Sequence, residues 1–234
     1  MNGTIISFPL RCLKALSDLF YPPVCEVCGR TLVEGEKYVC TSCFADFPFV
    51  DDDFSNDRDV LDAFDESIRP ENIHALFYYN KYSRYKNLIY RVKYGSNPEL
   101  GVFLGRMLGN KMKGHCTIDG VVPVPLHPKR ERKRGYNQAR EIARGICDVL
   151  NVELLDDVIV RVRNNVSQTG KNLNERVENV SGIFALNKPE VLVGRHILLV
   201  DDVITTGATV HACIKVMAVV ENVHFSLGCI GRTL

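Results

Sequence analysis

Residues 195–209 read Arg-His-Ile-Leu-Leu-Val-Asp-Asp-Val-Ile-Thr-Thr-Gly-Ala-Thr, and this stretch indicates the fold. Ile197–Val200 is an apolar run typical of a central parallel strand that is buried on both faces. Asp201 and Asp202 follow at the point where this strand is expected to leave the sheet. Residues 205–209 then lead into a predicted helix, whose first backbone N–H groups are suited to bind phosphate. The stretch therefore predicts an α/β fold with a sugar-phosphate site.

In this site the two carboxylates would accept hydrogen bonds from sugar hydroxyls, and Asp202, then Asp201, are the candidate catalytic residues. The phosphate would be held by the backbone N–H groups and hydroxyls of the turn, formed by Thr205, Thr206, Gly207, Ala208 and Thr209. The alternative is an ordinary strand–helix turn, because Thr-Thr-Gly alone is common. The unbroken register of apolar run, acidic pair and Thr-Thr-Gly-x-Thr favours the sugar-phosphate site.

The composition limits the class of protein. The chain has 234 residues, 46% of them hydrophobic, which is enough for one medium domain and a small module and excludes a disordered protein. A net charge of +1 argues against a partner recognised by charge over the whole surface. No stretch approaches the roughly 20 apolar residues of a membrane span. Met1–Phe20 suits an amphipathic helix better than a signal peptide, so a cytoplasmic location is expected.

Four cysteines form two pairs, Cys25-x2-Cys28 and Cys40-x2-Cys43, separated by 11 residues. Two such knuckles can bring four sulfurs onto one ion, as in zinc ribbons. Two disulfides, or a redox Cys-x-x-Cys, are the alternatives, and a cytoplasmic location disfavours the first. The pattern predicts a structural zinc ion with a filled coordination sphere.

An acidic run over residues 51–66 is read as a solvated linker. The expected organisation is an N-terminal helix and zinc module over residues 1–50, a linker over 51–72 and an α/β domain over 73–234. In the last part, strands are expected to alternate with helices, which favours a mostly parallel sheet. Residues 93–95 are expected to form a short basic loop with only a weak indication of function.

A basic cluster follows the predicted strand Asp119–Val124, at the edge where parallel sheets bind ligands. Its candidate anion-binding residues, for pyrophosphate or a nucleic-acid backbone, are Lys129, Arg130, Lys133, Arg134, Tyr136 and Gln138. A solvated loop is the simpler alternative for such a charge run. The polar stretch over residues 161–180, which contains Arg163, Gln168, Arg176 and Asn179, is expected to be a functional lid.

Taken together, these motifs resemble the ComF family. The resemblance rests on the four-cysteine module, Val-Pro-Val-Pro-Leu at 122–126, Lys-Arg-Gly-Tyr-Asn-Gln-Ala at 133–139 and the pattern Gln168, Leu173, Arg176, Asn179, Val180. It implies a type I phosphoribosyltransferase fold that binds phosphoribosyl pyrophosphate (PRPP) and Mg²⁺ at residues 197–209. It also implies a role in natural competence, with single-stranded DNA and proteins of the competence machinery as partners, at the inner face of the membrane.

Three hypotheses are compatible with this resemblance: a DNA-uptake factor, an active phosphoribosyltransferase with a nitrogen acceptor, and a PRPP-sensing regulator. In an active enzyme the lid would close over the site and exclude water. The sequence leaves open the acceptor, the turnover of PRPP and the oligomeric state, a homodimer included.

Overall fold

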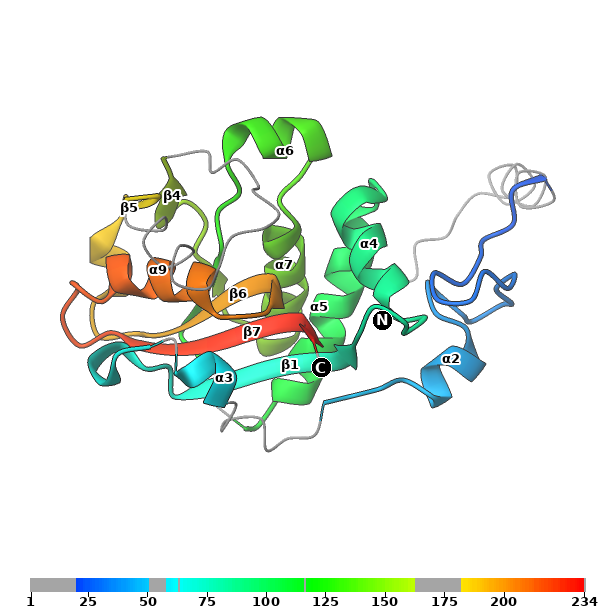
Figure 1. Ribbon diagram of the computed structural model, residues 1–234, viewed down its shortest axis with the longest axis horizontal. Coiled ribbons are helices and arrows are strands. Elements are labelled where there is room, and N and C mark those ends of the chain that lie inside the picture. Colours follow the sequence, from blue (N-terminus) through cyan, green and yellow to red (C-terminus); the bar gives the residue numbers. More distant parts are fainter. Residues whose placement is uncertain (1–19, 51–57, 63, 116, 163–181, 234) are drawn as a thin grey trace. The chain divides into compact units, whose positions relative to one another are not determined.

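A computed structural model describes residues 20–50, 58–62, 64–115, 117–162 and 182–233. The chain divides into two compact units, Met1–Phe47 and Pro48–Leu234 (Figure 1). In the first unit, two tight turns carry the cysteine pairs, and the second turn leads into helix α2 (Thr41–Ala45). Gly29 has a φ of 76°, the left-handed conformation that the first turn requires.

The second unit is built on a five-stranded sheet in which every pair of neighbouring strands is parallel. The strand order is β1-β7-β6-β2-β3. The strands are β1 (Asn72–Tyr79), β2 (Gly120–Pro123), β3 (Glu153–Leu154), β6 (His196–Ile204) and β7 (His224–Thr233). Because the strands are parallel, the segments that follow β1, β2 and β6 all start from the same edge of the sheet. The predicted parallel α/β class is confirmed.

Helices and turns connect these strands. They are α3 (Arg58–Leu61), η2 (Glu66–Ile68), α4 (Lys86–Tyr94), α5 (Pro98–Met112), α6 (Pro128–Arg134), α7 (Gln138–Leu150), η3 (Pro189–Leu192) and α9 (Ala208–Met217). Helices α5 and α7 pack against each other and against the sheet. Their contact depends on glycine, because a Cβ at Gly105 would lie 2.1 Å from the carbonyl oxygen of Ile142. A Cβ at Gly145 would lie equally close, 2.1 Å, to the carbonyl oxygen of Val102.

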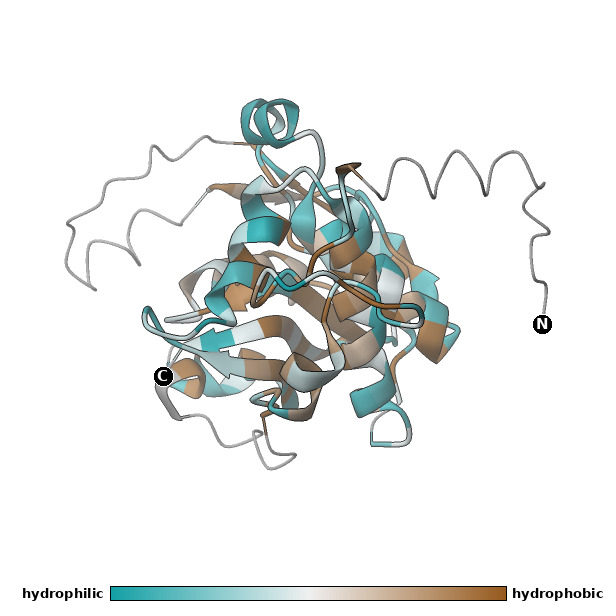
Figure 2. Ribbon diagram, turned by 90° about the vertical axis from the view of Figure 1, so that its right-hand side faces the viewer, coloured by the Kyte–Doolittle hydropathy of each residue, from teal (hydrophilic) through white to brown (hydrophobic). Residues whose placement is uncertain are grey.

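Helix α9 packs with alternate residues of β6 in the apolar core of the second unit. Ile197 and Leu199 are fully buried there with Cys213 and Ile214 of α9. The antiparallel pair β4 (Ile159–Arg161) and β5 (Phe184–Leu186) also packs against α9. Figure 2 shows apolar residues in the central strands and helices, whereas α6, uppermost in both views, is hydrophilic.

The expected linker differs from the structure. The compact units divide after Phe47, and Phe49 already pairs with Phe77 of β1. Val60 and Phe64, inside the predicted linker, are 0% and 5% exposed in the core of the second unit. The acidic composition around them concealed these two apolar anchors. Residues 51–57 lie outside the described part of the chain.

The basic cluster forms a helix rather than the expected loop. Pro128 occupies the first turn of α6, and the ring Nδ1 of His127 accepts a hydrogen bond of 3.2 Å from the N–H of Lys129. Gly135 ends the helix with a φ of 88°. Pro near the start and Gly after the end are helix boundary signals, which the sequence interpretation did not weigh against the charge. In the part of the chain that the structure describes, no helix combines the length and apolarity needed to cross a membrane.

Candidate functional site

The acidic pair lies within strand β6, which continues to Ile204 instead of ending before the aspartates. Side chains of a strand alternate between faces, so Asp201 lies on the face covered by α9, together with Leu199, and Asp202 lies on the other. Asp201 accepts a hydrogen bond of 2.8 Å at its Oδ1 from the backbone N–H of Asp202. Burial raises the pKa of Asp201 from 3.8 to about 7, and the neighbouring charge of Asp202 also raises it.

Lys93, near the end of α4, faces the acidic pair. Its Nζ lies 3.1 Å from Oδ1 of Asp202, and the two side chains are 26% and 13% exposed. Burial lowers the pKa of Lys93, but the attraction of Asp202, with its hydrogen bond, and of Asp201 exceeds this effect and raises the pKa. The site therefore contains a positive charge on Lys93. From the sequence alone, Lys93 is expected in a short basic loop over residues 93–95 and is not included in the site.

Two features hold α4 in this position. The hydroxyl of Tyr136 donates a hydrogen bond of 2.6 Å to the carbonyl of Val92, the residue before Lys93. Gly231 of β7 leaves room for the helix, because a Cβ there would lie 2.8 Å from Cδ1 of Ile89 and 2.9 Å from the ring of Tyr79. Tyr136, predicted to contact an anion, thus also fixes the position of Lys93.

Residues 201 and 203–210 line a cavity of about 40 Å³ at the start of α9. Gly207, the residue before the helix, has a φ of 74°, a conformation that glycine adopts without strain. From β7, Nη1 of Arg232 donates to the carbonyl of Thr205 at 2.9 Å, and the Arg232 side chain is buried. This hydrogen bond fixes the carbonyl of Thr205, and the N–H groups of the turn lie at the positive end of the helix dipole. Arg232 was not among the predicted residues, because it lies 27 positions away in sequence.

The basic helix α6 follows the carboxyl end of β2, next to β6 in the sheet. Lys129 and Lys133 are exposed, and Arg130 and Arg134 are half-buried. Gln138 is only 2% exposed, and its Oε1 accepts a hydrogen bond of 2.7 Å from Arg134. The buried side chain of Gln138 thus orients the guanidinium group of Arg134.

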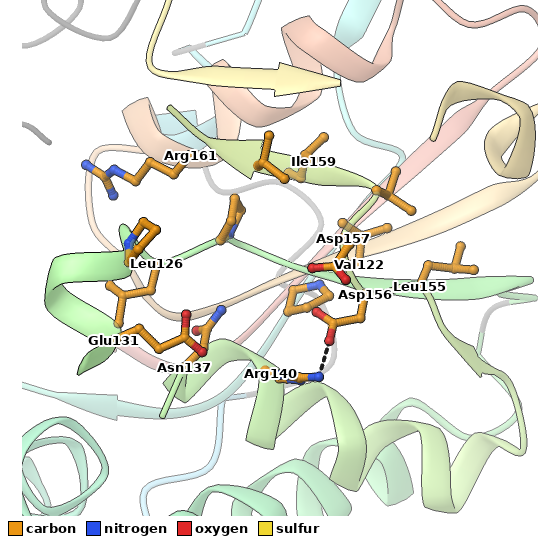
Figure 3. A pocket seen from close by; sticks show the side chains of 15 residues that line it. Val122, Leu126, Glu131, Asn137, Arg140, Leu155, Asp156, Asp157, Ile159 and Arg161 are labelled. Atoms are coloured by element: carbon orange, nitrogen blue, oxygen red, sulfur yellow. Dashed lines mark ion pairs between the residues drawn. The ribbon is translucent and has the colours of Figure 1, made fainter. Parts of the chain in front are cut away.

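A second cavity, of about 170 Å³, lies at the carboxyl ends of β2 and β3. Its lining includes Glu131 of α6 and Asn137 at the start of α7, and Arg161 of β4 lies on another side (Figure 3). Arg140 and Asp156 form an ion pair at its border (Figure 3). Burial raises the pKa of Asp201, and the positive charge of Arg161 partly offsets this rise, so Arg161 is electrostatically linked to the acidic pair. Sequence reasoning placed Arg161 at the start of the polar stretch but gave it no role.

The first unit contains the predicted metal centre. The sulfur atoms of Cys25, Cys28, Cys40 and Cys43 all lie within 4.8 Å of one another. Burial raises the pKa of the Cys25 thiol, but hydrogen bonds from backbone N–H groups, that of Cys40 first, exceed this effect and lower it to about 7. Four sulfurs at this separation, one of them poised to ionise, fit a tetrahedral structural zinc ion.

Glu36 links the two cysteine turns. Its Oε1 accepts hydrogen bonds of 2.7 Å and 2.8 Å from the N–H and the hydroxyl of Thr41, and it lies 2.9 Å from Nη2 of Arg30. Its Oε2 accepts from the N–H of Val33 at 3.0 Å. These hydrogen bonds, the backbone one from Thr41 first, lower the pKa of Glu36 to about 2. Glu36 is therefore the outer support of the metal centre.

The predicted lid residues Arg163, Gln168, Arg176 and Asn179 lie outside the described residues, which resume at residue 182. The structure brings the remaining candidates to two places. The four cysteines form one centre in the first unit. The acidic pair and the turn at 205–209 form the second, and α6 follows the neighbouring strand β2 at the same edge of the sheet.

Comparisons with known proteins agree with this division. Residues 16–54 match the double zinc ribbon domain, and residues 132–225 match the phosphoribosyl transferase domain. The second match includes the acidic pair, the turn at 205–209 and the last three residues of α6. The two parts of the chain are thus similar to a double zinc ribbon domain and to a phosphoribosyl transferase domain, which confirms the predicted fold class and supports structural zinc.

The similar proteins include three with related names. Competence protein F of Haemophilus influenzae is 35% identical over 101 residues, which cover 42% of this chain and 44% of that protein. The DNA utilization protein YhgH of Escherichia coli K12 is 28% identical over 153 residues, 63% of this chain and 66% of that protein. Competence protein ComFC of Streptococcus pneumoniae is 30% identical over 143 residues, 61% and 60% of the two chains. The matches thus span less than two thirds of the length of these relatives. The names of these relatives confirm the predicted resemblance to the ComF family.

Proposed function

We propose that this protein binds PRPP with Mg²⁺ at the carboxyl edge of its parallel sheet and acts in natural competence, in the handling of single-stranded DNA. The observation that carries the first part is the arrangement around β6. The acidic pair lies near the carboxyl end of β6, and a cavity of about 40 Å³ at a helix start follows it. A basic helix follows the neighbouring strand β2 at the same edge. The names of the similar proteins support the second part.

In this proposal Asp201 and Asp202 accept hydrogen bonds from the ribose hydroxyls. The turn at 205–209 binds the 5′-phosphate through its N–H groups and hydroxyls. The exposed cations of α6, chiefly Lys129 and Lys133, face the pyrophosphate. Lys93 offsets the charge of Asp202, so that an anionic ligand does not meet two uncompensated carboxylates.

The described residues fit a Mg²⁺ ion that arrives with the ligand. Oδ1 of Asp202 already forms an ion pair with Lys93, so oxygen atoms of the ligand would supply most of the coordination of Mg²⁺. The carboxylate of Asp201 could supply a further oxygen. When bound, the ion neutralises charge on the pyrophosphate. If PRPP is turned over, the protein mainly positions the ribose and stabilises the charge on the leaving pyrophosphate, because its cations and N–H groups are preorganised.

A thermal-shift titration of the full chain with PRPP at millimolar Mg²⁺ tests the ligand. We expect the wild-type melting temperature to rise with PRPP concentration and Asp202→Asn to lose at least nine tenths of the shift. Asp62→Asn, a change at an exposed carboxylate, is the matched control and should respond like wild type. No shift in the wild type, or an equal shift in Asp202→Asn, would refute the site.

The competence role is tested in naturally transformable cells in which this gene replaces their own ComF-type gene. Transformation frequency should be restored by the wild type and lost when Cys25 and Cys28 are both replaced by Ser. Pyrophosphate release, measured in the same titration with amine or nucleobase acceptors, separates an active transferase from a protein that only binds PRPP.

A further inference from the structure

The segment 81–94 has an unusual composition for the surface of a domain with a net charge near zero. Its 14 residues contain five Lys or Arg residues, four Tyr residues and no acidic residue. Basic side chains interleaved with aromatic ones are typical of surfaces that bind single-stranded nucleic acid, in which cations contact phosphates and rings stack on bases. Proposals made so far use only Lys93 from this segment.

Helix α4 presents two of these tyrosines to solvent. Its buried face consists of Leu88, Ile89 and Val92, and its outward stripe at helical spacing consists of Asn87, Tyr90, Arg91 and Tyr94. Tyr90 and Tyr94 are 58% and 66% exposed, and their ring centroids lie 6.3 Å apart at an interplanar angle of 34°. Two large rings that are exposed side by side contribute no hydrophobic stabilisation to the fold. Such an exposed aromatic patch therefore indicates a surface that is covered by a binding partner.

This stripe is continuous with the basic helix α6. The guanidinium carbon of Arg134 lies 5.3 Å from the centroid of the Tyr94 ring, a cation–π distance. The hydrogen bond from Tyr136 to the carbonyl of Val92 joins the same two segments. Arg132 and Lys133 are exposed beside Arg134. Rings and cations therefore form one surface, which we call the Tyr–Arg surface: Tyr90, Arg91, Tyr94, Arg132, Lys133 and Arg134.

We propose that the Tyr–Arg surface binds single-stranded DNA, with bases stacked on Tyr90 and Tyr94 and phosphates held by the flanking cations. The charge of the surface is complementary to a phosphate backbone, and its exposed rings require bases that are not covered by pairing, which disfavours duplex DNA. The choice of DNA over RNA rests on the proposed competence function. The surface shares Lys133 with the residues proposed to face the pyrophosphate, and it is otherwise separate from the proposed PRPP residues Asp201, Asp202 and 205–209. The variants below leave Lys133 unchanged, so the two proposals can fail independently.

The test measures fluorescence anisotropy of a 5′-labelled 30-mer of deoxythymidine with the full chain, at several salt concentrations. We expect Tyr90→Leu/Tyr94→Leu to weaken binding at least 10-fold, because leucine keeps an apolar side chain but cannot stack. Tyr90→Phe/Tyr94→Phe keeps both rings and should bind within about twofold of wild type. In Arg91→Gln/Arg132→Gln the logarithmic salt dependence should decrease by about 0.7 for each charge removed. Lys113→Gln, at an exposed cation after α5, is the control for charge.

The proposal is overturned if the wild type does not bind the 30-mer at low salt, or if the leucine variant binds like wild type. Tighter binding of a duplex or of an oligouridine of equal length would also overturn it, in favour of another nucleic acid. A PRPP titration of the leucine variant should match wild type, and Asp202→Asn should keep its affinity for DNA. If the wild type binds PRPP but not the 30-mer, the proposal for the Tyr–Arg surface has failed. If it binds the 30-mer but not PRPP, the proposed PRPP site has failed.

Discussion

The Nζ atom of Lys93 lies 3.1 Å from Oδ1 of Asp202, although the two residues are more than 100 positions apart in sequence. This ion pair joins the helix after β1 to the acidic pair in β6. Lys93 is charged, since its raised pKa keeps the proton at any physiological pH. The candidate site thus includes its own counter-ion before any ligand binds.

We expect Lys93→Met to weaken PRPP binding about 10-fold, because an anionic ligand would then approach an uncompensated carboxylate. The dissociation constant, measured by calorimetry at fixed Mg²⁺, should be largely restored in Lys93→Arg. Lys86→Met, at the start of the same helix, is the control. Tighter binding by Lys93→Met would instead mean that Lys93 competes with the ribose for Asp202.

Asp201→Asn should change how stability depends on pH. The pKa of Asp201 is raised by burial, so the folded protein holds this proton more tightly than the unfolded chain. The unfolding free energy of the wild type should therefore fall as pH rises from about 4 to about 7. The stabilising contribution of protonated Asp201 is complete at about pH 4 and is lost as pH rises through about 7. Asp201→Asn should be more stable than wild type by about 4 kcal/mol at pH 8 and equal to it near pH 4. Urea denaturation checks this, and an unchanged difference at both pH values would contradict it.

Gly105→Ala should destabilise the second unit by about 2–4 kcal/mol, because the new methyl group would collide with the carbonyl of Ile142. This result reverses the usual trend, in which Gly to Ala inside a helix stabilises. The control is Gly101→Ala in the same helix, whose Cβ would lie 3.1 Å from the Cβ of Glu141. Equal free energies of unfolding for the two variants would show that the contact between Gly105 and the carbonyl of Ile142 does not require glycine.

Glu36→Gln should weaken zinc binding about 10-fold, since residues that support metal ligands affect affinity on this scale. Competition with a chromophoric chelator measures the affinity, and Glu34→Gln, an exposed neighbour, is the control. The lowered pKa of Glu36 means that its stabilising effect is present above about pH 4.5 and is lost as pH falls toward 2. In the zinc-free protein, the difference in unfolding free energy between Glu36→Gln and wild type should disappear as pH falls from about 4.5 toward 2.

Local patterns in the sequence predicted the parallel sheet and the four-cysteine cluster correctly. An apolar run such as Ile197–Val200 shows directly that a strand is buried, and the two Cys-x2-Cys pairs define a metal centre by spacing alone. The turn at 205–209 lies at the start of α9 as predicted. In each case the signal is carried by adjacent residues.

Contacts between distant segments could not be predicted in the same way. Lys93 and Arg232 reach the site only because β1, β7 and β6 are neighbours in the sheet, and one sequence does not determine that order. The acidic character of residues 51–66 concealed Val60 and Phe64, which only a packed core reveals. Charge likewise concealed helix α6, although Pro128 and Gly135 marked its ends.

Gly231 shows how a backbone position can control an electrostatic distance. Ile89 occupies the space that a methyl group at Gly231 would need, and Ile89 lies one turn before Lys93 on the same helix. Any side chain at Gly231 would lift α4 from the strand and draw the ammonium group away from Asp202. In the proposed PRPP site, the affinity for an anionic ligand would therefore depend in part on a residue that carries no charge.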